Sequence, residues 1–166
     1  MLLSGGNELQ KSLHINPDSC TGCYQCVIAC SDEHGDNFNP IKSRIQVFRF
    51  EDEGRYVPYT CTQCDEAWCQ KACPTDAIST DASGTKIVSV ALCVGCKVCT
   101  IACPFGTVNY NADSGKVNKC DLCGGNPACV KACPTDAITF IDANTTGFDR
   151  MRNWAAKTDA GSQTSA

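Results

Sequence analysis

Apolar and polar positions alternate along much of the chain in short runs, which is typical of β-strands joined by tight turns. The segments AISTDASGTKIVSV (77–90) and TVNYNADSGKVNKC (107–120) each combine two such runs with an Asp/Ser/Gly turn. Both therefore predict a strand, a turn and a second strand. Around them, short segments without this alternation are expected to form one-turn helices.

A longer hairpin is predicted between the segments SRIQVFRF (43–50) and RYVPYTC (55–61), which flank the polar sequence EDEG. Within the first strand, Ile45, Val47 and Phe48 alternate imperfectly with polar neighbours. We therefore expect one face of this hairpin to be only partly buried.

Near the C-terminus the apolar pattern becomes helical. Phe148, Met151 and Trp154 recur at i, i+3 and i+6 and predict a short helix after Gly147. The same segment is locally basic, through Arg150, Arg152 and Lys157. This helix is expected either to cover the core of its own chain or to dock on another subunit or a second copy.

Cysteine dominates the composition, with 16 cysteines among 166 residues. The aliphatic and aromatic content is thin, so either disulfides or metal must help to hold the chain together. The N-terminal segment lacks the pattern of a secretory signal, and no apolar run is long enough to span a membrane. We therefore expect a cytoplasmic protein with reduced thiols, in which the cysteines bind metal.

The cysteine spacing indicates which metal. Two groups have the pattern C-x2-C-x2-C-x3-C, one has C-x2-C-x4-C-x3-C and one has C-x2-C-x5-C-x3-C. Pro follows the last cysteine of three groups, as Pro74, Pro104 and Pro134. The groups in chain order are Cys20, Cys23, Cys26 and Cys30; Cys61, Cys64, Cys69 and Cys73; Cys93, Cys96, Cys99 and Cys103; and Cys120, Cys123, Cys129 and Cys133.

This arrangement is that of bacterial ferredoxins, in which three cysteines hold one [4Fe–4S] cluster and the fourth binds the neighbouring cluster. Sixteen thiolates are enough for four [4Fe–4S] clusters. Zinc is disfavoured, because a third cysteine so close would crowd a tetrahedral site. Gly22 and Gly95, in the two C-x-G-C turns, are expected to let the backbone pass close to a cluster.

Two kinds of internal repeat are present. KACPTDAI occurs at 71–78 and again at 131–138, and CTGCYQCVIAC (20–30) matches CVGCKVCTIAC (93–103). The chain thus contains a duplicated pair of motifs, in which each octapeptide links one cluster to another. We predict an α+β fold of two ferredoxin-like units, each with two clusters.

Few residues indicate catalysis by the chain itself. No dinucleotide fingerprint, P-loop or nucleophile elbow is present, and the carboxylates form no paired acid/base arrangement. His14 and His34 are interpreted as surface or turn residues. The radical-SAM motif is absent, so we predict a non-catalytic electron-transfer protein. The net charge of −4 and the lack of a basic stripe argue against a nucleic-acid module.

Four lysines lie inside or beside the motifs, and they either keep a surface soluble or raise the potential of a nearby cluster. They are Lys71, Lys97, Lys119 and Lys131.

From Leu13 to Asp142 the chain resembles the four-cluster, ferredoxin-like subunits of molybdenum- and tungsten-pterin oxidoreductases. The resemblance is carried by KCDLC with PACVKACPTDAI, and by CTQCDEAWCQKACPT. It implies that motifs one and four exchange their last cysteines, as do motifs two and three. The implied ligand sets are Cys20, Cys23, Cys26 and Cys133; Cys120, Cys123, Cys129 and Cys30; Cys61, Cys64, Cys69 and Cys103; and Cys93, Cys96, Cys99 and Cys73. The residues alone do not exclude a sequential pairing, of motif one with two and of motif three with four. The gap of 19 residues between Cys73 and Cys93 is, however, of the length that a two-cluster ferredoxin uses.

The resemblance also implies a domain organisation. Residues 12–35 plus 104–142 would form an outer ferredoxin-like unit and 58–103 an inner one. Residues 36–57 would be a hairpin insertion, and 143–166 a C-terminal helix with a polar tail.

The fourth motif lacks the long insertion of many relatives, holding only DLCGGNPA between its first and third cysteines, Cys120 and Cys129. The chain is in this respect similar to the small polyferredoxin subunits of tungsten aldehyde oxidoreductases. Expected partners are a pterin-containing catalytic subunit, a flavin or other redox subunit, and further copies of the chain. The alternatives are a subunit of a dimethyl-sulfoxide-reductase-like, formate dehydrogenase or hydrogenase complex, and a free-standing polyferredoxin.

Overall fold

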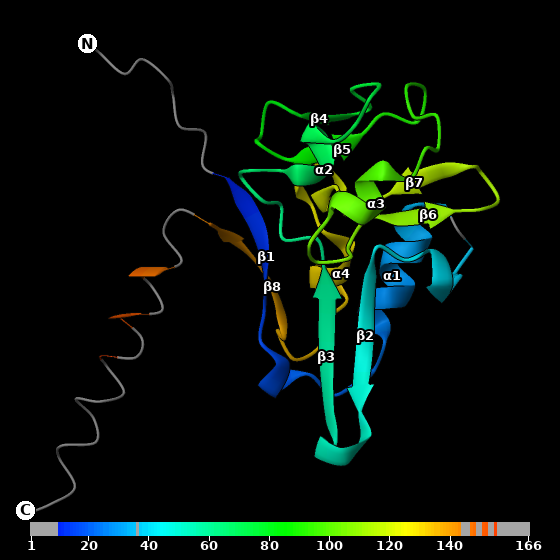
Figure 1. The fold of residues 1–166 in the computed structure, drawn as a ribbon. Coiled ribbons are helices and arrows are strands. Elements are labelled where there is room, and N and C mark those ends of the chain that lie inside the picture. Colours follow the sequence, from blue (N-terminus) through cyan, green and yellow to red (C-terminus); the bar gives the residue numbers. More distant parts are fainter. Residues whose placement is uncertain (1–9, 36, 144–146, 149–150, 153–154, 156–166) are drawn as a thin grey trace, which may run out of the picture.

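The computed structural model describes residues 10–35, 37–143, 147–148, 151–152 and 155 (Figure 1). Short helices and strands alternate along the chain in a mixed α and β arrangement. The strands are β1 (Lys11–Ile15), β2 (Ile45–Phe50), β3 (Arg55–Thr60), β4 (Ile78–Thr80), β5 (Lys86–Val88), β6 (Asn109–Asn111), β7 (Lys116–Asn118) and β8 (Ile138–Asp142). The α-helices are α1 (Gln25–Glu33), α2 (Trp68–Lys71), α3 (Val98–Ala102) and α4 (Ala128–Lys131). Single 3-10 turns lie at Pro17–Ser19, Pro40–Lys42, Glu51–Glu53 and Leu122–Gly125.

The three hairpins expected from the sequence are confirmed. Strands β2 and β3, β4 and β5, and β6 and β7 each form an antiparallel pair. Ile45 and Val47 are buried, whereas Phe48 is 52% exposed. The apolar face of the long hairpin therefore ends halfway along β2, which explains the imperfect alternation.

A fourth strand pair joins the two ends of the ferredoxin-like region. β1 pairs antiparallel with β8, with Leu13 opposite Phe140 and Ile15 opposite Ile138. Figure 1 shows the two strands side by side, β1 in blue and β8 in orange. This pairing brings the first and fourth cysteine motifs together.

Two groups of buried side chains form the interior. Helix α1 packs against α4, and α2 against α3. The first core is Leu13, Cys26, Val27, Cys30, Ile45, Val47, Cys61, Cys120, Leu122, Cys129 and Ile138. The second core is Ala67, Cys69, Ala77, Ile78, Cys93, Cys99, Val108 and Val117. Cysteines occupy many of the buried positions, so much of each core consists of metal-binding side chains.

The repeated octapeptide has the same local structure in both copies. Each begins at the end of a four-residue helix, α2 or α4, and then turns through an aspartate, Asp76 or Asp136, with positive φ. Each ends in a buried Ala-Ile pair that enters a strand, β4 or β8. The proline after the cysteine needs no hydrogen-bond acceptor, so the helix can end there.

The division into two units remains a prediction. The β6–β7 hairpin packs into the second core through Val108 and Val117, although the expected boundary at residue 104 assigns it to the outer unit. The predicted C-terminal helix falls largely outside the described residues. Of its three apolar positions, Phe148 and Met151 are described and are exposed, whereas Trp154 lies outside the described residues. Among the described helices, none is both long and apolar enough to cross a membrane.

Candidate metal centres

All sixteen cysteines are free thiols, and they meet in groups that mix different motifs. Cys26 has Cys20, Cys23 and Cys133 as electrostatic neighbours. These four cysteines also line one small cavity beside the long hairpin. The last cysteine of the fourth motif thus lies with the first three of the first motif.

The reciprocal arrangement occurs at the fourth motif. Cys129 has Cys120, Cys30 and Cys123 as neighbours, of which Cys30 is the last cysteine of the first motif. The packing of α1 against α4 produces both of these groups.

The second and third motifs are combined in the same way. Cys69 has Cys61 and Cys103 as neighbours. Cys99 has Cys73 and Cys96 as neighbours. Both groups follow from the packing of α2 against α3. In all four groups the donors are thiols, which suits an iron–sulfur cluster.

Electrostatic interactions between cysteines of different groups link the groups in a row. Cys99 of the third motif neighbours Cys69 of the second. Cys120 of the fourth motif neighbours Cys61 of the second, and Cys129 also neighbours Cys26 of the first. The order in space is therefore motif three, two, four and one.

Exposure distinguishes the ends of this row from its middle. Cys23 of the first motif and Cys96 of the third are exposed, whereas the other fourteen cysteines are buried or partly buried. Each end of the row thus presents one thiol at the surface.

Burial and hydrogen bonding act in opposite directions on the thiol pKa values. Burial raises the pKa of Cys26, Cys99 and Cys120 to about 11. Burial thus favours the protonated form of these thiols, and cluster binding, which needs thiolates, must release their protons.

The last cysteine of every motif behaves differently. Burial opposes ionisation of these four thiols, but hydrogen bonds outweigh it and lower each pKa. Donors near three of them include a threonine two or four residues later, with Oγ1 3.5–3.8 Å from Sγ. At the first motif, His34 Nδ1 lies 3.9 Å from Cys30 Sγ and contributes most to lowering the pKa, and the backbone N–H of Arg44 donates to the same sulfur over 3.4 Å. The four cysteines are Cys30, Cys73, Cys103 and Cys133.

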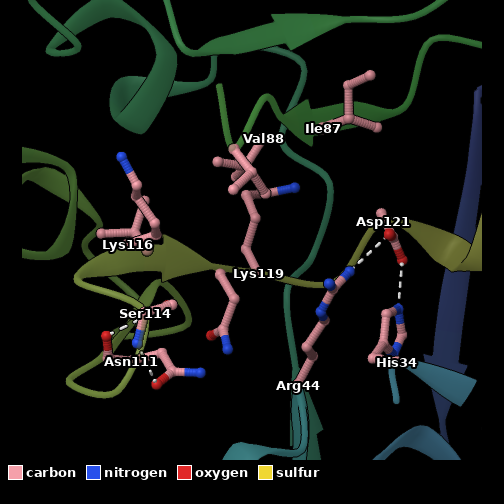
Figure 2. A pocket seen from close by; sticks show the side chains of 12 residues that line it. His34, Arg44, Ile87, Val88, Asn111, Ser114, Lys116, Lys119 and Asp121 are labelled. Atoms are coloured by element: carbon pink, nitrogen blue, oxygen red, sulfur yellow. Dashed lines mark hydrogen bonds and ion pairs between the residues drawn. The ribbon is translucent and has the colours of Figure 1, made fainter. Parts of the chain in front are cut away.

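An ion-pair network that the sequence did not reveal lies beside the fourth motif. Asp121 accepts from Arg44 Nη1 at 2.5 Å and from His34 Nε2 at 3.2 Å (Figure 2). His34 Nδ1 donates to the carbonyl of Cys30 at 2.7 Å. The bond to Asp121, reinforced by Cys30, raises the pKa of His34 to about 10, so this histidine is charged and is not a simple surface residue.

The same residues could in principle hold a cation. The ligand atoms of His34, Asp121 and Cys123 lie within 4.8 Å of one another. However, Cys123 belongs to the fourth motif and Asp121 is already bound by Arg44. We therefore treat His34 and Asp121 as surroundings of the cysteine site and not as a separate cation site.

The four lysines beside the motifs differ in burial. Lys71, Lys97 and Lys131 are exposed. Lys71 pairs with Glu66, and Lys97 lies over the Tyr110 ring with its Nζ 4.0 Å from the centroid. Lys119, in contrast, is 2% exposed. The sequence placed Lys119 directly beside the fourth motif, but its burial could not be predicted from the sequence.

Gly95 offers a test of how tightly the cysteine loops are packed. Its φ is +71°, and a Cβ there would collide with the backbone oxygen of Gly115. Gly22 faces the Tyr56 ring in the same way. We expect Gly95→Ala to lose the cluster of its loop, because neither the backbone nor its neighbour can move aside cheaply. Iron content measures the loss of the cluster, and the thermal unfolding midpoint measures the loss of stability.

Gly124→Ala is the matched control. Gly124 also has positive φ (+61°), but a Cβ there would have no heavy atom within 4 Å. Only the left-handed backbone should then cost stability, about 1–2 kcal/mol. Equal effects of the two substitutions would contradict a role for the contact between the 95 and 115 loops.

Comparison with known proteins agrees with the cysteine chemistry. Residues 53–143 match the model of the 4Fe-4S dicluster domain, and residues 13–35 match that of a 4Fe-4S binding domain. The chain belongs to the 4Fe-4S dicluster family. With sixteen cysteines arranged as above, its cofactors are four [4Fe–4S] clusters.

The chain is similar to named subunits of several redox complexes. It is 42% identical over 88 residues to the polyferredoxin-like subunit of an aliphatic sulfonate oxidoreductase from Pyrococcus furiosus, covering 52% of this chain and 50% of that protein. It is 37% identical over 82 residues to formate hydrogenlyase subunit 2 from Escherichia coli (49% and 39%). It is 32% identical over 85 residues to a subunit of tetrathionate reductase from Archaeoglobus fulgidus (51% and 41%).

The chain thus spans between 39% and 50% of the length of these relatives. Among solved structures, a chain of the BamBC active-site complex of benzoyl coenzyme A reductase is 29% identical, with a TM-score of 0.46 over 79% of this chain and 75% of that chain.

Proposed function

We propose that the chain is an electron-transfer subunit of an oxidoreductase complex, with four clusters held by crossed cysteine sets. The first site is Cys20, Cys23, Cys26 and Cys133; the second is Cys61, Cys64, Cys69 and Cys103; the third is Cys93, Cys96, Cys99 and Cys73; and the fourth is Cys120, Cys123, Cys129 and Cys30. The neighbour relations of Cys26, Cys69, Cys99 and Cys129 support these sets.

The observation that carries the proposal is the row of sites with one exposed cysteine at each end. Cys96 belongs to the third site and Cys23 to the first, and the second and fourth sites lie between them. A protein that receives electrons from one partner and delivers them to another needs two accessible ends and a shielded middle. Bound [4Fe–4S] clusters supply one-electron redox chemistry.

The protein residues hold and shield the sites. The cysteine thiolates would bind the iron, and nearby hydroxyl and backbone N–H groups would donate to the sulfurs and stabilise negative charge there. The chain is not itself a catalyst in this proposal.

Apolar side chains surround the exposed end at the third site, where Val94, Val98 and Ile101 are exposed. Ile101 is 86% exposed. At the other end, Tyr24 and Ile28 are exposed beside the first site. These surfaces are suited to partner subunits.

For the catalytic partner we propose a tungsten-pterin aldehyde oxidoreductase in the cytoplasm, with a flavin subunit as the second redox partner. The short fourth motif supports this choice. The similarity to the polyferredoxin-like subunit of an aliphatic sulfonate oxidoreductase from Pyrococcus furiosus supports the role of a polyferredoxin subunit within such a complex. The similarity to formate hydrogenlyase subunit 2 supports a second candidate, a formate dehydrogenase or hydrogenase complex.

Anaerobic purification of the native complex tests the partner. We expect a pterin-containing subunit and tungsten to co-purify with the chain, together with flavin. Molybdenum or nickel in the purified complex, in place of tungsten, would favour the second candidate. A chain that purifies alone with reducible clusters would be a free-standing polyferredoxin, and a chain without reducible iron would overturn electron transfer itself.

A further inference from the structure

Lys119 is a buried lysine between β7 and the fourth motif. It follows β7 directly and precedes Cys120 of the fourth motif. Figure 2 shows it in a cavity lined by Val88 on one side and by Arg44 and Asp121 on another. The residue is only 2% exposed, so its ammonium group has little access to water.

A closed ring of hydrogen bonds fixes the position of this ammonium group. Lys119 Nζ donates to the carbonyl oxygens of Lys86 and of Cys120, the latter at 2.8 Å. Gln63, also buried, donates from Nε2 to the same Cys120 oxygen at 2.7 Å. Its Oε1 accepts from the backbone N–H of Lys86 at 2.9 Å. The ring therefore ties the second motif, β5 and the fourth motif to one another.

The ammonium group has no carboxylate partner among the described residues. Asp121 is the one carboxylate that lines the cavity, and it is bound by Arg44 and His34. A buried cation held only by carbonyl oxygens loses its hydration without a compensating ion pair. Some other negative charge is needed nearby in the working protein.

The ligand thiols are the groups that can provide this charge. Lys119 acts electrostatically on Cys69 of the second site and on Cys120 of the fourth. Cys61 of the second site is in turn a neighbour of Cys120. Lys119 therefore lies where the two middle sites meet, and far less of its charge is screened by water than at an exposed lysine.

We propose that Lys119 is the fixed counter-charge of the junction between the second and fourth sites, and that it raises the reduction potentials of these two sites relative to the two end sites. The inference rests on the proposed electron-transfer function. Reduction adds one electron, taken from an external reductant, to a site that is already negative, and the nearby ammonium group stabilises the added charge. No bond is made or broken in this step.

Lys119→Met tests the proposal by removing the charge while keeping most of the side-chain volume. In a redox titration of the full chain with dithionite, followed by electron paramagnetic resonance, we expect two of the four couples to shift to lower potential. The expected shift is at least tenfold in the reduction equilibrium, or about 59 mV for a one-electron couple. Lys119→Arg, which keeps the charge, should leave the couples near their original potentials.

Lys131→Met is the matched control, because Lys131 is an exposed lysine within a motif. Unchanged couples in a Lys119→Met protein with full iron content would overturn the proposal, as would an equal shift in Lys131→Met. If Lys119→Met fails to incorporate iron, Lys119→Gln carries the same test, because its amide can donate to a carbonyl without a charge. Failure of the proposed function would look different, since the unmodified chain would then show no reducible couples.

Discussion

Anaerobic removal of iron is expected to unfold the chain rather than to leave a compact metal-free form. Cys26, Cys30, Cys61, Cys120 and Cys129 belong to the first core, and Cys69, Cys93 and Cys99 to the second. Without clusters, the apolar residues that remain are too few to hold these cores together. Every described sheet has only two strands, and an isolated two-stranded sheet is marginal in water.

Metal binding would supply the missing folding free energy, as in other small metalloproteins. Far-UV circular dichroism during chelation, with iron content measured in parallel, should show both signals fall together and the cooperative melting transition disappear. A strong thiol reductant must be present, so that disulfides do not form from the released cysteines. Reconstitution with iron and sulfide should restore the transition. A metal-free chain with a native-like spectrum and a cooperative melt would contradict this expectation.

Cys73→Ala is expected to remove the cluster of the third site, although Cys73 is part of the second motif. The basis is its position beside Cys99 rather than beside Cys69. Loss of one ligand should cost one cluster of four, roughly a quarter of the iron. The remaining signals should match those of a Cys96→Ala variant, which loses a ligand that both pairing schemes assign to the third site.

Cys64→Ala provides the opposite reference, because Cys64 belongs to the second site in either scheme. The sequential pairing would place Cys73 at the first site, so the Cys73→Ala spectrum would match that of Cys23→Ala. A match to Cys23→Ala, or to Cys64→Ala as expected without any exchange between motifs, would make the crossed pairing wrong. Cys103→Ala gives the reciprocal check, since it should match Cys64→Ala and differ from Cys96→Ala.

Local features of the sequence were sufficient to predict the three hairpins and the cluster type. The polar turns at 81–84 and 112–115 connect strands a few residues apart, so neighbouring residues determine these pairs. Cysteine spacing within each motif is likewise local. The burial of Ile45 and Val47 follows from the same alternation.

Long-range contacts could not be read from these patterns. The pairing of β1 with β8 brings Lys11 opposite Asp142, and a two-residue alternation contains no information on such a partner. The ring around Gln63 and Lys119 depends on packing of three distant segments. His34 looked like a turn residue because its partner Asp121 lies far along the chain.

The pairing of β1 with β8 also has a consequence for the order of events during synthesis. β1 and the cysteines that follow it leave the ribosome first, whereas β8 emerges only after Cys133 has been made. The entropic cost of closing this loop grows only slowly with its length, but the pair cannot form until β8 has been made. The inner cysteines, between Cys61 and Cys103, can meet while the chain is still growing. The N-terminal cysteines remain free thiols until β8 has paired with β1. Among the four motifs, the first is therefore exposed to oxidation for the longest time.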